Sequence, residues 1–257
     1  MNTRDPFFTR RGVLAGAGAL GLAACESGAN SDTADRAART PPGMPSNTRE
    51  PAPEAAARAP AENAAQTPAD APVVTMLGDS ITAGYGLSAA QALPVQLEAA
   101  LRDLGVPARV RGAGVSGDTT AGGLARVDFS VRDDTDVAVV ALGGNDLLQG
   151  VAPAEVKRNL DGIITKLKAR GITVVLAGMR GPPQFGSYTA EYDAAFADLA
   201  RQHQLAFYPF LLNGVALVQR YNQSDGIHPN AEGARLIAAG LAPVVAGALR
   251  QGVGNRE

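Results

Sequence analysis

The chain has 257 residues, of which 46% are hydrophobic and 19% charged, enough for one globular domain with a large core. The formal net charge of -2 provides no basic surface, so we expect no nucleic-acid partner. The single cysteine, Cys25, excludes an intrachain disulfide, and two histidines, His203 and His228, make no Cys/His cluster for zinc. We expect no metal, no cofactor and a monomeric protein.

Residues 1–25 have the pattern of an export signal. Arg10-Arg11 precede a short Ala/Gly/Leu stretch that ends at Leu22-Ala23-Ala24-Cys25, and this stretch is too short and glycine-rich for a transmembrane helix. Its start resembles a twin-arginine signal, and its end resembles a bacterial lipoprotein box with Cys25 as the lipidated residue. We therefore expect a periplasmic or cell-envelope protein that lipidated Cys25 anchors to a membrane. The alternative is an ordinary secretory signal with a fortuitous cysteine.

Residues 26–72 contain no Val, Leu, Ile, Phe or Tyr and are rich in Ala and Pro. Such a segment cannot bury enough apolar surface to offset its ordering entropy, so we predict a disordered tether. The alternative is a segment that folds when it binds a partner. The folded domain is expected at 73–250, followed by a tail at 251–257.

Strand and helix patterns alternate along the domain. Short apolar runs predict strands at 73–77, 108–112, 136–142, 172–177 and 205–210. Apolar residues at helical spacing, with Pro and Gly near the ends, predict helices at 91–104, 119–129, 153–170, 188–203 and 230–249. This order predicts a parallel sheet with helices on both faces, a three-layer α/β/α fold, whose ligand site lies at the carboxyl ends of the strands.

Residues suited to nucleophilic catalysis occur after these strands. A serine hydroxyl needs a base within hydrogen-bond reach, and His228 is the candidate base for Ser80. Asp225 lies three residues before His228 and can orient its ring. The alternatives are a helix-start residue for His228 and a turn residue for Asp225. His203 is expected to have a structural role at a helix end.

Attack on a carbonyl also needs donors for the developing oxyanion. Gly117 can bring a backbone N–H close, Asn145 can offer its amide NH2, and the backbone N–H of Ser80 can be the third donor. The alternative is that the glycine-rich segments around Gly117 and Asn145 are ordinary turns. We expect Asp146 to cap the segment that follows it.

Ser80 lies in Gly-Asp-Ser-Ile rather than in a G-x-S-x-G elbow, which argues against the α/β-hydrolase family. The chain instead resembles the SGNH (GDSL-type) hydrolases, and most closely the bacterial arylesterase, acyl-CoA thioesterase I and lysophospholipase group. The resemblance rests on four stretches, at 77–86, 115–126, 142–146 and 225–230. It implies a flavodoxin-like sheet of five parallel strands. It also implies Ser80 as nucleophile, Gly117 and Asn145 as oxyanion donors, and Asp225 and His228 as triad partners.

The substrate class follows from the same resemblance. It implies hydrolysis of small acyl esters and thioesters through an acyl-enzyme on Ser80, with lysophospholipids among the candidate substrates. In the loop at 180–188 we expect Phe185 and Tyr188 to contact the acyl group; the alternative is that Tyr188 opens a helix and packs in the core. Two other functions stay open: a deacetylase of cell-envelope sugar esters, and a non-catalytic lipoprotein that binds acyl or glycan ligands.

Overall fold

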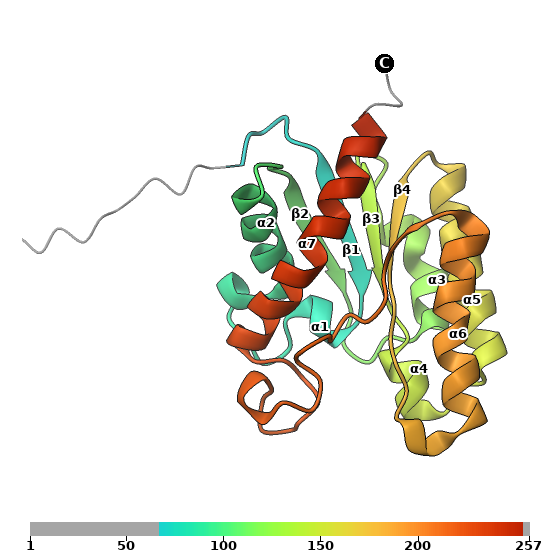
Figure 1. Cartoon of the computed structure of the whole chain (residues 1–257). Coiled ribbons are helices and arrows are strands. Elements are labelled where there is room, and N and C mark those ends of the chain that lie inside the picture. The colour runs from blue at the N-terminus through green and yellow to red at the C-terminus, as the bar shows by residue number, and fades with distance from the viewer. Residues whose placement is uncertain (1–66, 254–257) are drawn as a thin grey trace, which may run out of the picture. The chain divides into compact units, whose positions relative to one another are not determined.

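A computed structural model describes residues 67–253. They form a parallel sheet with helices on both faces, which confirms the predicted α/β/α architecture (Figure 1). The strand order is β2-β1-β3-β4-β5. The strands are β1 (Val73–Gly78), β2 (Arg109–Gly114), β3 (Val137–Ala141), β4 (Thr173–Ala177) and β5 (Ala206–Tyr208).

The helices form two layers. Helices α2 and α7 pack against each other on one face of the sheet, while α3, α5 and α6 cover the other face (Figure 1). The α-helices are α1 (Ser80–Ala83), α2 (Leu93–Asp103), α3 (Thr120–Ser130), α4 (Gly144–Gln149), α5 (Pro153–Ala169), α6 (Ser187–His203) and α7 (Ala231–Val253). Three short 3-10 helices are η1 (Ala89–Gln91), η2 (Pro183–Phe185) and η3 (Gln219–Tyr221).

The two central strands explain why this sequence makes a parallel sheet. Every residue of β1 and β3 is buried, and both strands are nearly continuous apolar runs. Strands that helices cover on both faces have this pattern, because neither side of the strand meets water. Helix α5 completes one half of the core with a buried stripe at helical spacing, made of Val156, Leu160, Ile163, Ile164 and Leu167.

The structure differs from the predicted boundaries at both ends of the domain. Residues 67–72, which were assigned to the tether, are ordered: the Thr67 hydroxyl donates to Glu98 at 2.9 Å, and Ala71 is buried. At the other end, α7 continues to Val253 instead of ending near Leu249. Residues 1–66, which include Cys25, lie outside the described part of the chain.

Over Ala231–Gln251, helix α7 is long and apolar enough to cross a membrane, and more than half of that stretch is buried inside the protein. It packs against α2 and against β3, β4 and β5. These contacts make α7 a helix of the core.

Candidate active site

The predicted site residues converge at the carboxyl edge of the sheet. Ser80 directly follows β1, Gly117 follows β2, Asn145 lies in α4 after β3, and the turn at 225–228 follows β5. Strand β1 pairs with β2 on one side and with β3 on the other. The chain therefore leaves β1 and β3 in opposite directions, which opens a crevice between their ends.

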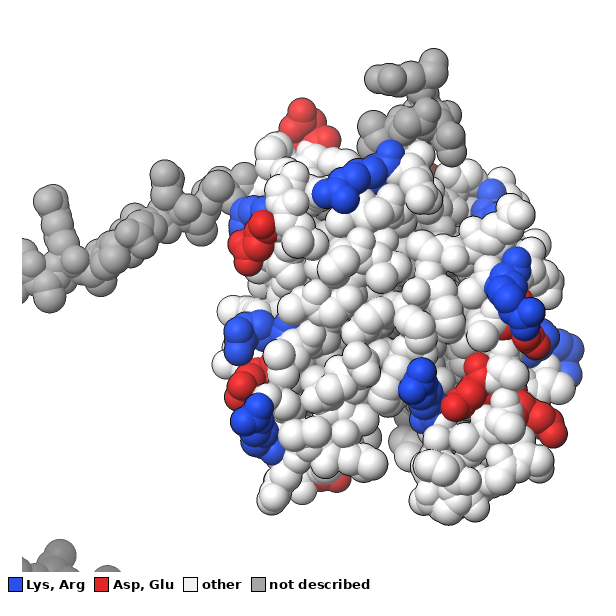
Figure 2. Space-filling view, viewed as in Figure 1, with Lys and Arg blue, Asp and Glu red and all other residues white. Residues whose placement is uncertain are grey.

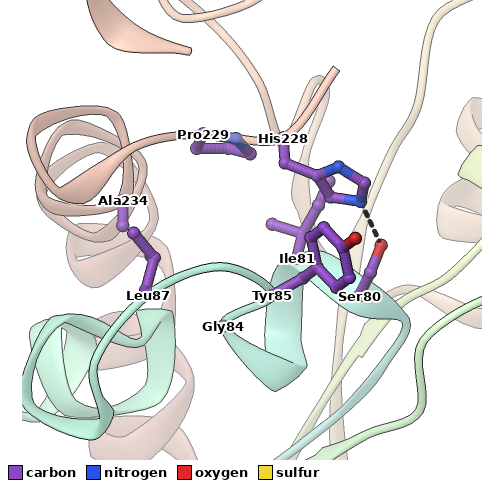
Figure 3. A pocket seen from close by; sticks show the side chains of 8 residues that line it. All are labelled: Ser80, Ile81, Gly84, Tyr85, Leu87, His228, Pro229 and Ala234. Atoms are coloured by element: carbon purple, nitrogen blue, oxygen red, sulfur yellow. Dashed lines mark hydrogen bonds between the residues drawn. The ribbon is translucent and has the colours of Figure 1, made fainter. Parts of the chain in front are cut away.

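Ser80, His228 and Asp225 form a continuous row of hydrogen bonds. The Ser80 Oγ lies 2.9 Å from His228 Nε2, and Nδ1 of the same ring lies 2.7 Å from Asp225 Oδ2 (Figure 3). The serine and the histidine come from opposite ends of the domain, 148 positions apart in the sequence. The structure thus brings together the three residues that the sequence analysis selected.

The short turn between Asp225 and His228 keeps the Asp225 carboxylate ionised. Asp225 Oδ1 accepts hydrogen bonds from the backbone N–H groups of Ile227 at 2.9 Å and His228 at 3.0 Å. The backbone N–H of His228, followed by its ring, lowers the pKa of Asp225 to about 2. The carboxylate is therefore ionised and accepts a hydrogen bond from Nδ1–H, which leaves the lone pair of Nε2 facing Ser80.

Asp79 positions the segment that carries Ser80. Its side chain accepts a 3.0 Å hydrogen bond from the backbone N–H of Ile81 and so caps α1, which begins at Ser80. Asp79 is 3% exposed, and this burial raises its pKa to about 6, against the hydrogen bond from Ile81, which lowers it. The sequence analysis assigned no role to Asp79, although an aspartate just before a short helical turn is a common capping signal.

Two of the three predicted oxyanion donors are tied together. Gly117 has φ of 83°, a conformation that favours glycine, and Asn145 Nδ2 donates to the backbone oxygen of the next residue, Asp118, at 2.9 Å. An amide NH2 has two protons, so the second N–H of Asn145 remains free for a ligand. The roles of Gly117, Asn145 and the Ser80 N–H as oxyanion donors stay predictions.

Arg126 clamps the strand ends beneath Gly117. Its Nε donates to Asp118 at 2.7 Å, Nη1 to the Ala113 carbonyl at 2.9 Å and Nη2 to the Gly78 carbonyl at 2.8 Å. One guanidinium therefore joins the end of β1, the end of β2 and the Gly117 turn. Sequence reasoning missed this role, because an arginine in a helix gives no signal of which carbonyls it reaches.

The prediction for Asp146 was wrong. Its carboxylate is fully buried and accepts from the backbone N–H of Thr120 at 2.8 Å and from the Thr120 hydroxyl at 2.5 Å. It therefore caps α3, an earlier helix, and not the segment that follows it. The reason is that α4 already begins at Gly144, so Asp146 lies within its first turn.

Besides the hydrogen bond between their side chains, contacts of Tyr85 and Gln223 hold His228 beside Ser80. The Tyr85 ring lies next to the imidazole of His228, with centroids 4.5 Å apart (Figure 3). Gln223 Nε2 donates to the Tyr85 carbonyl at 2.7 Å and to the Pro229 carbonyl at 3.0 Å. The backbone N–H of Gln223 also donates to the His228 carbonyl at 2.8 Å. Gln223 lies outside the four motif stretches, so the sequence alone did not indicate its role.

The residues proposed for substrate contact lie at the same edge. Phe185 is exposed in η2, whereas Tyr188 is partly buried, packs against the core and donates to the Val151 carbonyl at 2.9 Å. This packing supports the alternative interpretation of Tyr188. A role for either residue in substrate binding stays a prediction. His203 ends α6, and its Nε2 lies 2.6 Å from Asp161 Oδ1.

A small hollow borders the Ser80–His228 pair on one side. It is lined by Ser80, Ile81, Gly84, Tyr85, Leu87, His228, Pro229 and Ala234 (Figure 3). In the part of the chain that the structure describes, no three His, Cys, Asp or Glu side chains are grouped to hold a metal ion. What the site does offer is a hydroxyl, a base and an ionised carboxylate in line, the arrangement that serine hydrolases use.

Comparison with known proteins assigns the chain to a family. Residues 76–236 match the model of the GDSL-like lipase/acylhydrolase family. The chain is 40% identical over 163 residues to the esterase TesA of Pseudomonas aeruginosa, covering 63% of this chain and 81% of the relative. It is 34% identical over 176 residues to thioesterase 1/protease 1/lysophospholipase L1 of Escherichia coli (strain K12), covering 68% and 83%. The chain therefore belongs to the GDSL-like lipase/acylhydrolase family and is an enzyme that hydrolyses ester bonds.

Solved structures agree with the assignment. The crystal structure of a protein titled TesA matches with a TM-score of 0.64 and 36% identity, covering 68% of this chain and 99% of that one. AlinE4, described as an SGNH-hydrolase family esterase, matches with a TM-score of 0.59 and 43% identity, covering 70% and 97%. The resemblance to SGNH hydrolases is thus confirmed. The matched region covers nearly the whole length of each of these solved chains.

Proposed function

We propose that Ser80 is the nucleophile of a two-step hydrolysis with His228 as its base. Ser80 Oγ attacks the carbonyl carbon of the ester while His228 Nε2 takes the hydroxyl proton, and Asp225 stabilises the imidazolium that forms. The tetrahedral intermediate expels the alcohol or thiol, which receives the proton from His228. Water then attacks the carbonyl carbon of the acyl-Ser80 ester while His228 takes a proton from the water. When the acid is released, His228 returns that proton to Ser80 Oγ.

The observation that carries this proposal is the unbroken row from Ser80 Oγ to His228 at 2.9 Å and from His228 to Asp225 at 2.7 Å. Residues Gly117 and Asn145 support it, since the hydrogen bond from Asn145 to Asp118 holds both donors at one end of the crevice. Each donor that reaches the oxyanion in the transition state is worth about 3 kcal/mol. We therefore assign the oxyanion site to these two residues and the Ser80 N–H.

The substrates that we propose are small acyl esters and thioesters, with lysophospholipids among them. The names of the relatives support this choice, because they include an esterase, an arylesterase and a thioesterase/lysophospholipase. We further propose that the protein is exported and that lipidated Cys25 holds it at a membrane. A Cys25→Ser variant should then lose incorporation of an alkyne-labelled fatty acid in cells, whereas a Cys25 protein that takes up no label would contradict the anchor.

The decisive experiment is hydrolysis of p-nitrophenyl esters from acetyl to palmitoyl, with the wild-type protein beside Ser80→Ala. We expect turnover on several chain lengths and its loss in Ser80→Ala, with circular dichroism showing that the variant is folded. Hydrolysis that survives Ser80→Ala would contradict the nucleophile. Turnover of acetyl esters alone would favour the sugar-ester deacetylase, and no turnover of any ester would favour the binding protein.

A further inference from the structure

Exposed apolar side chains gather around the entrance to the catalytic site. Six of them lie on loops or short helices at the carboxyl edge of the sheet, on segments that follow all five strands. We call them the apolar rim: Tyr85, Val115, Leu148, Phe185, Leu217 and Ile227. Figure 2 shows this end of the molecule as two lobes with a notch between them, and the tips of the lobes carry few charges in this view. Exposed apolar side chains placed around a site on five separate segments suit a surface that contacts another molecule.

Leu217 gives the clearest sign that the rim has a function. Its side chain is 95% exposed, and its φ of 62° lies in the left-handed region, which costs a leucine about 1 kcal/mol. The other described residue of this kind, Gln204, ends helix α6, where the conformation is common. Leu217 follows a single helical turn, in which the Ala216 N–H donates to the Leu212 carbonyl at 2.9 Å, and its side chain buries almost nothing within the protein. A strained backbone at a side chain with so little contact inside the protein suits a residue that contacts another molecule.

The charges around the rim indicate what that molecule is. On the loops that carry the rim, the exposed charged residues are Arg180, Arg220 and Asp225, and Asp225 is bonded to His228. Exposed carboxylates near the starts of the helices that follow these loops are Glu155, Glu191 and Glu232. Both arginines lie against aromatic rings, Arg180 at 5.6 Å from Phe210 and Arg220 at 4.4 Å from Tyr221. Guanidinium groups beside exposed apolar side chains suit a phospholipid surface, where the phosphates meet the arginines and the acyl chains meet the apolar groups.

The rim is also dispersed, with one or two side chains on each loop around a hollow centre. A protein partner would need a continuous, closely packed patch, whereas a fluid bilayer accepts separate apolar side chains. We propose that the apolar rim rests on a phospholipid bilayer and seats the entrance of the site on the membrane surface. This inference builds on the proposed function, because a hydrolase of acyl lipids gains by placing its entrance where those lipids lie.

The test uses residues 67–257, the part that corresponds to the chains solved in relatives, with Ser80→Ala so that no lipid is hydrolysed. Vesicles of phosphatidylcholine with about one quarter phosphatidylglycerol are sedimented with the protein. Leu217→Asn should bind the vesicles about fivefold more weakly, because one apolar side chain is removed from the interface. Asparagine tolerates the left-handed conformation, so this variant should fold as well as its parent. The double variant Leu148→Gln/Leu217→Asn should bind more weakly still.

Phe129→Asn is the matched control, because Phe129 is 91% exposed on α3, away from the rim, and should bind as its parent does. A parent protein that does not sediment with vesicles, or equal binding by Leu217→Asn and Phe129→Asn, would overturn the proposal. In the second case a protein partner for the rim would be the better explanation. Hydrolysis of dissolved p-nitrophenyl butyrate by the same protein with Ser80 intact separates the membrane-binding proposal from the proposed function. Turnover without vesicle binding contradicts only the membrane surface, and vesicle binding without turnover contradicts only the proposed function.

Discussion

Gln223 holds Tyr85 through a 2.7 Å hydrogen bond from Nε2 to the Tyr85 carbonyl, although 138 positions separate the two residues in the sequence. The same amide donates to the Pro229 carbonyl, next to His228. Tyr85 in turn donates its backbone N–H to the Ser80 carbonyl at 3.0 Å. Gln223 therefore joins the segment that carries the nucleophile to the turn that carries the base, and it is a positioning residue for both.

Gln223→Leu should lower kcat about tenfold or more while KM stays nearly constant, because His228 loses its fixed position relative to Ser80 without loss of a substrate contact. Steady-state kinetics on p-nitrophenyl butyrate measure the two constants. Gln96→Leu is the control, since Gln96 Nε2 donates to the Ala90 carbonyl with the same 2.7 Å bond away from the site. Equal kcat in the two variants would show that Gln223 has only a structural role.

Asp225→Asn tests the orientation of the base. The variant keeps the shape of the side chain but loses the ionised carboxylate that stabilises the imidazolium, so kcat should fall about 100-fold or more. The protein supplies its own control in a second aspartate–histidine pair, Asp161 and His203, at 2.6 Å. Asp161→Asn should leave kcat unchanged. If Asp225→Asn kept full kcat, His228 would need no carboxylate partner, and the proposed triad would reduce to Ser80 and His228.

The buried carboxyl of Asp79 predicts a pH dependence of stability. Its pKa is raised from 3.8 to about 6 in the folded protein, so between these pH values the unfolded chain releases a proton that the folded protein still holds. The free energy of unfolding should therefore fall as pH rises through this range, by about 3 kcal/mol in all at ~1.4 kcal/mol for each pH unit. Above pH 6 this contribution should be constant.

Asp79→Asn isolates that contribution, because asparagine keeps an oxygen to accept from Ile81 and carries no charge. Urea unfolding at pH 4, 5, 6 and 7 should show the variant gaining on the wild-type protein, with most of the gain complete by about pH 6. Parallel stability curves for the two proteins would contradict the raised pKa.

Arg126→Met should destabilise the fold by about 2–4 kcal/mol, because Asp118 loses its ion pair in a mostly buried place and the Ala113 and Gly78 carbonyls each lose a hydrogen bond. The side chains of Arg126 and Asp118 are only 19% and 11% exposed. The exposed pair Arg111–Asp134, at 29% and 53%, is the comparison, and Arg111→Met should cost less than about 1 kcal/mol. Equal losses of unfolding free energy in urea would show that the Arg126–Asp118 pair contributes no more than an exposed surface ion pair.

The sequence predicted the sheet well, because β1 and β3 are buried on both faces and their apolar runs leave little ambiguity. It also selected Ser80, Asp225 and His228, since motifs at strand ends converge in a parallel sheet. The short helices α1 and α4 were missed because elements of four and six residues have no measurable periodicity. Strand β5 ends at Tyr208, earlier than expected, where Pro209 lacks the N–H to continue the ladder.

The hydrogen bonds that support the site could not be predicted from the sequence for a different reason. Gln223 and Arg126 act through carbonyl oxygens, and any residue can supply a carbonyl. Nothing in the sequence therefore marks Tyr85 or Gly78 as their partners. Asp146 is a further example, since its carboxylate accepts from the backbone N–H of Thr120 in another helix, 26 positions away. Which side chain reaches which distant backbone group is decided by packing of the whole domain.

Both ends of the described chain lie at the amino edge of the sheet, opposite α1 and α4 (Figure 1). Strand β1 starts there shortly after Thr67, and α7 returns to the same edge before it ends at Val253. A bead, an electrode or a fluorescent reporter attached directly at Thr67 or at Val253 would therefore face away from Ser80. The domain immobilised at these two positions should keep its catalytic face turned toward the reaction mixture.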